Sequence, residues 1–266
     1  MEIRLVASDL DGTLLRSDGS ISHYTRSVLQ QVAAIVPIAL VTARPPRTAQ
    51  LIAAHFTLNT HLICCNGALV CDLASGRVMR HRPIAPESAR HLIETFRRAL
   101  PGVVFAAELE LAYACEPGYR ALMASHDHLT DPGPFIGDAL EFCAVPVTKL
   151  VVRHPQHTAS TLAGVLESAL GAGLVATYSG NDFLEISASG VHKASALAAL
   201  AEELHIQPQN VLAFGDMRND IPMLAWAGRS IAVANAHPEV LTAAQETVPS
   251  NDEDGVALTL ERLLLT

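Results

Sequence analysis

Two apolar runs in this 266-residue chain end in acidic side chains. One run leads into Asp9 and Asp11, and the other leads into Asp216, Asn219 and Asp220. If both runs are parallel strands, their carboxyl ends share one edge of a sheet, which is where such sheets bind ligands. Carboxylates gathered there repel one another unless a cation lies among them. Because oxygen ligands suit a hard divalent cation, we expect Mg²⁺ at this edge.

A hydroxyl and an ammonium group are expected at the same edge. Thr42 follows a third apolar run, residues 38–41, and Lys193 begins a helical pattern late in the chain. Together with free backbone N–H groups, these side chains would donate to the oxygens of a phosphoryl group and balance its charge. The combination predicts phosphoryl transfer.

Strand and helix patterns alternate at both ends of the chain. The expected strands are residues 3–8, 38–42, 61–65, 210–216 and 230–235, and the expected helices are 23–35, preceded by Ser22, and 48–56, 191–204, 221–226 and 255–264. Apolar content without many aromatic residues, 50% against 5%, suits helices packed on a buried sheet. The alternation predicts an α/β fold, a Rossmann-like doubly wound parallel sheet.

The middle of the chain has a different pattern. Short strand-like runs and a Gly/Pro-rich stretch, residues 131–138, replace the regular alternation between residues 103 and 188. This pattern predicts a smaller, mostly antiparallel α+β domain. We expect a core formed by residues 1–82 and 189–266, with residues 83–188 inserted as a cap.

Composition excludes several classes of partner. With 18 basic and 27 acidic side chains the net charge is −9, and no basic cluster is present, so nucleic acid is not expected to bind. The longest apolar stretch, residues 32–43, is shorter than the roughly 20 residues that span a bilayer. Five cysteines without CxxC spacing, and acidic residues near the start in place of a secretory signal, favour a reduced cytoplasmic protein.

The chemistry-bearing residues occur in the order and spacing of a known family. The segment from Asp9 to Thr13 resembles the first motif of the haloacid dehalogenase-like phosphatases, Thr42 the second, Lys193 the third, and residues 215–220 the fourth. Further segments are similar to the Cof-type branch: Asn66-Gly67-Ala68, residues 191–193, Asn235-Ala236 and residues 251–256. Some positions depart from the usual pattern. Ala43 stands where Gly is common, His192 and Ala194 flank Lys193 where Ser and Gly are usual, and Met217 is bulkier than the residue common in the fourth motif.

The resemblance implies a role for each motif residue. Asp9 would attack phosphorus and form an aspartyl-phosphate, while Asp11 would act as general acid and then as general base. Metal would be held by Asp9, by the backbone carbonyl of Asp11 and by Asp216. The remaining implied roles are phosphate binding by Thr42, Ala43, Lys193 and Asn219, and support by Asp220. The implied substrates are small phosphomonoesters such as sugar phosphates, and the implied enzyme is a monomer or a small homo-oligomer.

The sequence leaves alternative functions open for these residues. A phosphomutase or phosphotransferase would share the motifs but release no free phosphate, and a non-catalytic sugar-phosphate-binding protein would keep the fold alone. His126, Asp127, His128 and Asp131 form a weak candidate zinc cluster. Lys149 is expected to be solvated or ion-paired, and Arg44 to contact substrate or form a structural ion pair.

Overall fold

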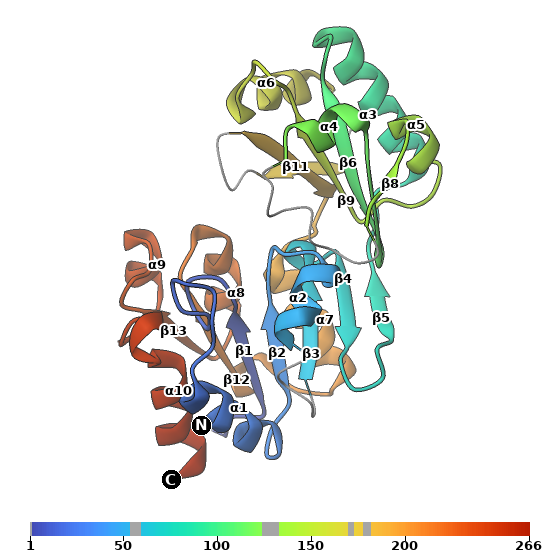
Figure 1. The fold of residues 1–266 in the computed structure, drawn as a ribbon. Coiled ribbons are helices and arrows are strands. Elements are labelled where there is room, and N and C mark those ends of the chain that lie inside the picture. The colour runs from blue at the N-terminus through green and yellow to red at the C-terminus, as the bar shows by residue number, and fades with distance from the viewer. Residues whose placement is uncertain (1, 54–59, 124–132, 170–172, 178–181) are drawn as a thin grey trace. The chain divides into compact units, whose positions relative to one another are not determined.

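The chain folds into two compact units. The computed structural model describes residues 2–53, 60–123, 133–169, 173–177 and 182–266. One unit comprises residues 1–80 and 192–266, and the other comprises residues 81–191 (Figure 1). The insertion expected at residues 83–188 lies within the second unit.

The first unit is built on an eight-stranded sheet with the order β14-β13-β12-β1-β2-β3-β4-β5. Its strands are β1 (Leu5–Asp9), β2 (Ile38–Val41), β3 (Thr60–Cys64), β4 (Leu69–Asp72), β5 (Val78–His81), β12 (Val211–Gly215), β13 (Arg229–Val233) and β14 (Glu246–Val248). The pairs from β14 through to β3 are parallel, and β4 runs antiparallel to β3. This topology confirms the predicted α/β class.

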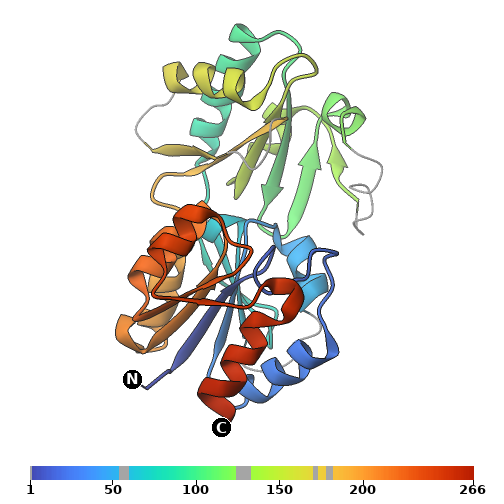
Figure 2. The same ribbon diagram turned by 90° about the vertical axis from the view of Figure 1, so that its left-hand side faces the viewer.

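Helices cover both faces of this sheet (Figure 2). They are α1 (His23–Ala33), α2 (Pro46–Ala53), α7 (Lys193–Glu203), α8 (Ile221–Trp226), α9 (Pro238–Ala243) and α10 (Gly255–Leu260). Helix α1 packs beside α10, and α7 packs beside α8 on the opposite face. Strands β1, β2 and β12 are buried at every residue, as expected for parallel strands covered on both faces.

Short 3-10 and π-helical turns connect or extend the elements of this unit. The 3-10 turns are η1 (Cys65–Gly67), η3 (Pro208–Asn210), η4 (Arg218–Asp220) and η5 (Asn251–Glu253), and a π-helical turn, η6 (Glu261–Leu265), follows α10. Ser22 caps α1 by accepting the N–H of Thr25, so the helix begins where its sequence pattern predicts.

The second unit is a six-stranded sheet with helices. Its strand order is β10-β11-β9-β6-β7-β8, and among the described residues β7 and β8 form the one parallel pair. The elements are β6 (Val104–Leu109), β7 (Ala112–Cys115), β8 (Phe135–Ile136), β9 (Lys149–Arg153), β10 (Leu174–Thr177), β11 (Phe183–Ala188), α3 (Pro86–Ala99), α4 (Pro117–Ala121), α5 (Ala139–Phe142) and α6 (Ala159–Ala169). The main hydrophobic core lies between this sheet and helices α3, α5 and α6.

Several short elements differ from the sequence prediction. The sequence predicts no helix or strand at α4, α5, α9 or β14. These elements have three to six residues, which are too few for a hydrophobic period to be recognised. The helix predicted at residues 48–56 begins earlier, at Pro46, and residues 54–56 lie outside the described part, as do residues 124–132 with the candidate zinc cluster.

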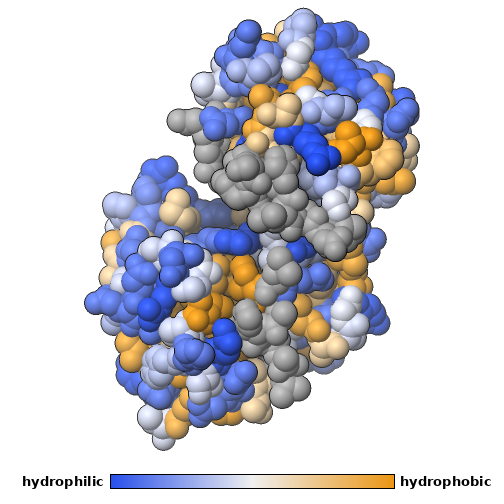
Figure 3. Space-filling view, viewed as in Figure 1, coloured by the Kyte–Doolittle hydropathy of each residue, from blue (hydrophilic) through white to orange (hydrophobic). Residues whose placement is uncertain are grey.

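Among the described residues, no helix has the length and apolar character needed to cross a bilayer. Hydrophilic residues predominate on the face shown in Figure 3, with hydrophobic side chains in smaller groups.

Candidate active site

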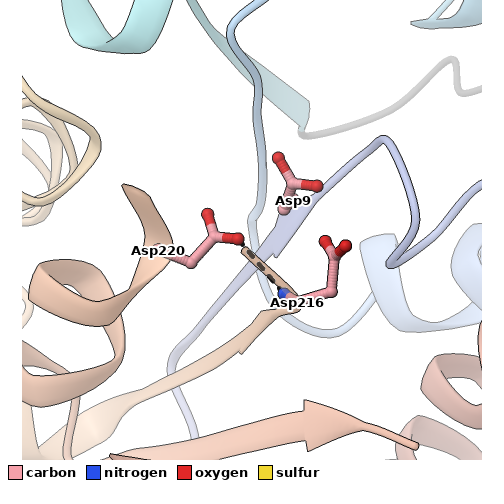
Figure 4. Close-up of side chains that lie close together, drawn as sticks. All are labelled: Asp9, Asp216 and Asp220. Carbon is pink, nitrogen blue, oxygen red and sulfur yellow. Dashed lines mark hydrogen bonds between the residues drawn. The ribbon is translucent and has the colours of Figure 1, made fainter. Parts of the chain in front are cut away.

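Three carboxylates converge at the carboxyl edge of the first sheet (Figure 4). Asp9 ends β1, Asp216 directly follows β12, and Asp220 ends η4. One oxygen from each of them lies within 4.8 Å of the others, and all three residues are buried. The sequence placed Asp9 and Asp216 as metal ligands and Asp220 as a support, and the structure brings these three together.

Lys193 is the ammonium group of this cluster. It is the first residue of α7 and is 2% exposed. Its Nζ donates to Asp9 Oδ1 at 2.5 Å and to Asp220 Oδ1 at 2.7 Å. The other oxygen of Asp220 accepts the N–H groups of Asp216 and Met217, at 3.1 and 3.0 Å. Asp220 therefore anchors Lys193 to the loop that carries Asp216.

Close backbone packing sets the position of Lys193. His192 caps α7 by accepting the N–H of Ser195. Gly67, with φ +105°, lies against this cap, since a Cβ there would approach His192 O to 2.6 Å. The Asn66-Gly67 turn thus lets η1 approach the start of α7 closely enough to fix the lysine.

The cluster carries more negative than positive charge. Burial raises the pKa of Asp9 well above its ordinary value, although the ammonium of Lys193 acts in the opposite direction. Burial likewise raises the pKa of Asp216, with Asp220 adding to the shift and the Thr13 hydroxyl opposing it. Burial lowers the pKa of Lys193, but Asp9 and Asp220 more than offset this and the net shift is upward. Removal from solvent thus dominates the shifts of the two carboxyl groups, while the single ammonium faces three carboxylates and does not balance their charge.

This imbalance fits a divalent cation. Three buried carboxylates supply the hard oxygen ligands that Mg²⁺ prefers, and a bound cation would compensate the charge that Lys193 leaves unbalanced. The donor set, oxygen only, does not suit a soft metal.

The Asp11 carboxylate lies outside this cluster. Its side chain is 49% exposed and forms an ion pair with Arg44, whose Nη2 lies 2.5 Å from Asp11 Oδ1. Arg44 Nε also donates to Asp11, at 2.8 Å to Oδ2. These hydrogen bonds raise the pKa of Arg44, against the opposing effect of its burial. Of the two alternatives open for Arg44, the structure shows the ion pair, and it is with Asp11.

The remaining expected phosphate-binding residues follow β2 or lie within η4. Thr42 is fully buried, and its Oγ1 accepts the N–H of Arg44 at 3.0 Å. Its carbonyl accepts the N–H of Asn66 at 3.1 Å, which ties the turn containing Ala43 to η1. Asn219 donates from Nδ2 to Asn66 Oδ1 at 3.2 Å. Asn219 is therefore linked to the Asn66-Gly67 turn.

Two further residues support the cluster and were assigned no role from the sequence. Thr13 Oγ1 donates to Asp216 Oδ1 at 2.6 Å. Gly12 has φ +79°, and a Cβ there would meet Asp216 Oδ2 at 2.5 Å. Both belong to the first motif, so their place in that motif was the available signal. Lys149, in contrast, is buried in the second unit and pairs with Glu185.

Comparison with known proteins agrees with this geometry. The sequence model of the haloacid dehalogenase-like hydrolases matches residues 6–260. An HMP-PP phosphatase of Yersinia pestis is 30% identical over 89% of this chain and 86% of the relative. The 5-amino-6-(5-phospho-D-ribitylamino)uracil phosphatase YitU of Bacillus subtilis is 26% identical over 95% and 94% of the two chains.

Solved structures show the same fold. The crystal structure of a haloacid dehalogenase-like hydrolase from Bacteroides thetaiotaomicron superposes with a TM-score of 0.83 at 25% identity, covering 99% of this chain and 100% of that chain. The family match spans nearly the whole chain and includes every residue of the buried cluster. The chain belongs to the haloacid dehalogenase-like hydrolases, in the Cof-type branch that its motifs indicate.

Proposed function

We propose that this enzyme is a Mg²⁺-dependent phosphatase that hydrolyses small phosphomonoesters through an aspartyl-phosphate at Asp9. The observation that carries the proposal is the buried contact of Asp9 with Lys193 beside Asp216 and Asp220. An aspartate held this way at the carboxyl edge of a parallel sheet can attack a phosphoryl group, whose negative charge the cations of the site would balance. Relatives named as phosphatases support the same chemistry.

The first half-reaction transfers the phosphoryl group to the enzyme. A carboxylate oxygen of Asp9 bonds to phosphorus as the bond between phosphorus and the ester oxygen breaks. Asp11, once it has left Arg44 and taken a proton from solvent, gives that proton to the departing oxygen, so the product alcohol leaves neutral. The second half-reaction reverses this role: Asp11 accepts a proton from water as the water oxygen attacks phosphorus. Inorganic phosphate leaves and the Asp9 carboxylate is regenerated.

The other residues bind the phosphoryl oxygens and hold the reacting groups in line. Lys193 donates from Nζ, Thr42 from its hydroxyl, and the turn at Ala43 and the Asn219 amide supply further N–H donors. Asp9, Asp216 and the Asp11 backbone carbonyl are the groups that would hold Mg²⁺, with Asp220 supporting them. The bound cation would supply positive charge between two anions that otherwise repel.

The second unit is proposed to select the substrate. The first unit carries all the groups named in the reaction, so recognition of the non-reacting part of a metabolite falls to other surfaces. Residues 83–188 are the proposed cap, acting on small phosphorylated metabolites such as sugar phosphates. We propose a cytoplasmic enzyme, a monomer or small homo-oligomer, without nucleic acid or membrane as partner.

Phosphate release from a panel of phosphorylated metabolites tests this proposal. Wild type with Mg²⁺ is expected to release inorganic phosphate from at least one small monoester. Asp9→Asn, which keeps the side-chain volume but is a far poorer nucleophile, is expected to release none. Consumption of substrate without free phosphate would instead favour a phosphomutase or phosphotransferase. Substrate binding without any turnover would favour a sugar-phosphate-binding protein.

A further inference from the structure

We propose that Asn235 and Asn251 are positioning residues of the active site, which hold the loop after Asp9 and through it the Asp216 carboxylate. The inference rests on the proposed function in one respect, that Asp216 serves a metal-dependent phosphatase. Both asparagines lie far along the chain from Asp9, in segments that the reaction leaves unused. Their hydrogen bonds nevertheless run directly into the first motif.

Asn235 links the first motif to the strand-end loop of β13. Its Nδ2 donates to the carbonyl of Gly12 at 2.7 Å. The peptide that follows Gly12 belongs to Thr13, whose hydroxyl donates to Asp216 Oδ1 at 2.6 Å. Holding the Gly12 carbonyl therefore fixes the peptide that aims the Thr13 hydroxyl at the carboxylate of Asp216.

The same segment also holds the main chain of Asp216. The N–H of His237, two residues after Asn235, donates to the carbonyl of Asp216 at 2.8 Å. The hydrogen bonds thus close a ring that runs from Asn235 through Gly12 and Thr13 to Asp216, and back through His237. Asp216 is fixed at both its backbone and its side chain. A closed ring of this kind restrains the orientation of the carboxylate, which favours its use as a ligand of an octahedral cation.

Asn251 sets the orientation of the Asn235 amide and holds the far end of the loop. The N–H of Asn251 donates to Asn235 Oδ1 at 3.0 Å, so the amide nitrogen of Asn235 must face Gly12. If the Asn235 amide were flipped, its NH₂ group would face the N–H of Asn251, and its oxygen would face the carbonyl oxygen of Gly12. Asn251 is 4% exposed, and its own Nδ2 donates to the carbonyl of Leu15 at 2.8 Å. The two amides thus hold the loop at both Gly12 and Leu15.

Substitution of Asn235 tests the proposal directly. Asn235 is exposed, so Asn235→Ala is expected to fold. It is expected to lose only the hydrogen bond donated to the Gly12 carbonyl and the one accepted from the N–H of Asn251. We expect the Kd for Mg²⁺, measured by calorimetry, to rise about 10- to 100-fold, as when groups behind metal ligands are removed. We expect kcat to fall with it, while KM for p-nitrophenyl phosphate stays near the wild-type value.

A second readout needs neither metal nor turnover. Hydrogen exchange of amides 10–16 in the metal-free protein is expected to speed up in Asn235→Ala and in Asn251→Asp, which removes the donor to Leu15. The matched control is Asn210→Ala, since Asn210 Nδ2 also donates to a backbone carbonyl of the same unit, that of Glu2, at 2.8 Å. This control is expected to leave Mg²⁺ affinity, kcat and exchange of residues 10–16 unchanged.

The outcomes separate this proposal from the proposed function. Wild-type Mg²⁺ affinity and unchanged exchange in Asn235→Ala would overturn the positioning role, even in an active phosphatase. Equal changes in Asn235→Ala and Asn210→Ala would also overturn it, since they would reflect general loss of stability. A chain that hydrolyses no monoester, but whose loop exchange responds to Asn235→Ala and not to Asn210→Ala, would contradict the proposed function and support the positioning role.

Discussion

Arg44 holds the Asp11 carboxylate through both carboxylate oxygens, outside the cluster that surrounds Asp9. The pair is solvent-accessible, with Arg44 36% and Asp11 49% exposed. Exposed ion pairs of this kind contribute only about 0–1 kcal/mol, so the contact can be exchanged at little cost. Arg44 therefore holds the carboxylate that we propose for proton transfer in one orientation, without preventing its movement toward substrate.

Asp11→Asn is expected to discriminate between substrates by their leaving groups. Departure of an alkoxide needs a proton, whereas p-nitrophenolate leaves without one. We therefore expect kcat/KM for an alkyl phosphate to fall about 10²-fold or more, and kcat/KM for p-nitrophenyl phosphate to change little. Steady-state kinetics with the two esters measure this. Equal losses on both would remove Asp11 from leaving-group protonation.

Arg44→Met is expected to act through Asp11. We expect a smaller loss on the alkyl phosphate than in Asp11→Asn, and no further loss when the two changes are combined, because residues that act as a unit are not additive. The control is Arg218→Met, since Arg218 forms an exposed ion pair with Glu239 in the same unit. Additive losses in the double variant would show that Arg44 acts independently of Asp11.

The sequence predicts those parts of the site that depend on strand ends. Asp9, Thr42 and Asp216 each directly follow or end a fully buried apolar run, and such runs identify parallel strands. Asp11 is different. Its spacing from Asp9 suggests that both carboxylates face the same cluster, but Gly12 turns the chain with φ +79° and Asp11 pairs with Arg44 instead. Local conformation after the strand decides this, and apolar periodicity carries no information about it.

Contacts to backbone carbonyls escape sequence reasoning altogether. The partners of Asn235 and Asn251 are main-chain atoms of Gly12 and Leu15, so no side-chain type at those positions signals the contact. Lys149 shows the same limit for burial. It begins a strand, and as a charged residue it is expected at the surface, but in the structure it is 4% exposed and lies beside Glu185 of the neighbouring β11.

Gly12→Ala is expected to weaken metal binding through a direct clash. A Cβ at Gly12 would reach Asp216 Oδ2 at 2.5 Å. Gly19 is a matched control, because its φ of +80° is close to the +79° of Gly12 and a Cβ there would meet nothing within 4 Å. Both substitutions place alanine in the left-handed region and are expected to lower stability by about 1–2 kcal/mol.

Only Gly12→Ala is expected to change the active site. Displacement of a ligand by about 1 Å is enough for a rate loss of about 10²-fold, so we expect lower kcat and weaker Mg²⁺ binding in this variant alone. Thermal unfolding, Mg²⁺ calorimetry and steady-state kinetics on both variants measure the difference. Gly19→Ala with the same Mg²⁺ affinity and kcat as Gly12→Ala would contradict a role for the contact with Asp216.

Lys193→Arg is expected to abolish most activity despite keeping the charge. Lys193 Nζ donates to two carboxylates from a site only 2% exposed, and a planar guanidinium replaces this compact donor poorly. We expect kcat to fall about 10²- to 10³-fold, the usual effect of losing an electrostatic donor.

Lys149→Arg is the matched substitution. It is expected to lower the unfolding temperature, since Lys149 is also buried, but to leave kcat on p-nitrophenyl phosphate near wild type. Kinetics at a temperature where both variants remain folded measure the difference. A similar loss of kcat in both would contradict a specific role of Lys193.

Stabilisation by Mg²⁺ is expected to grow with pH. In the metal-free protein, burial raises the pKa values of Asp9 and Asp216 above the ordinary 3.8. A carboxyl group whose pKa is raised in the folded state stabilises the fold at pH values below its ordinary pKa. This stabilisation is lost as the pH rises through the raised pKa. Metal binding needs the ionised carboxylates, so Mg²⁺ recovers stability where the metal-free protein has lost it. The increase in Tm on adding Mg²⁺ should therefore be larger at pH 8 than at pH 5.

Calorimetric or fluorescence melting with Mg²⁺ or with EDTA at both pH values measures this effect, and activity should disappear with EDTA and return with Mg²⁺. Asp216→Asn is expected to remove most of the Mg²⁺-dependent shift. Asp72→Asn, which alters a carboxylate that accepts the Ser75 N–H in the β4–β5 connection, is expected to keep the shift. The same shift at both pH values, or equal loss of the shift in the two variants, would mean that the cation does not bind at the buried carboxylates.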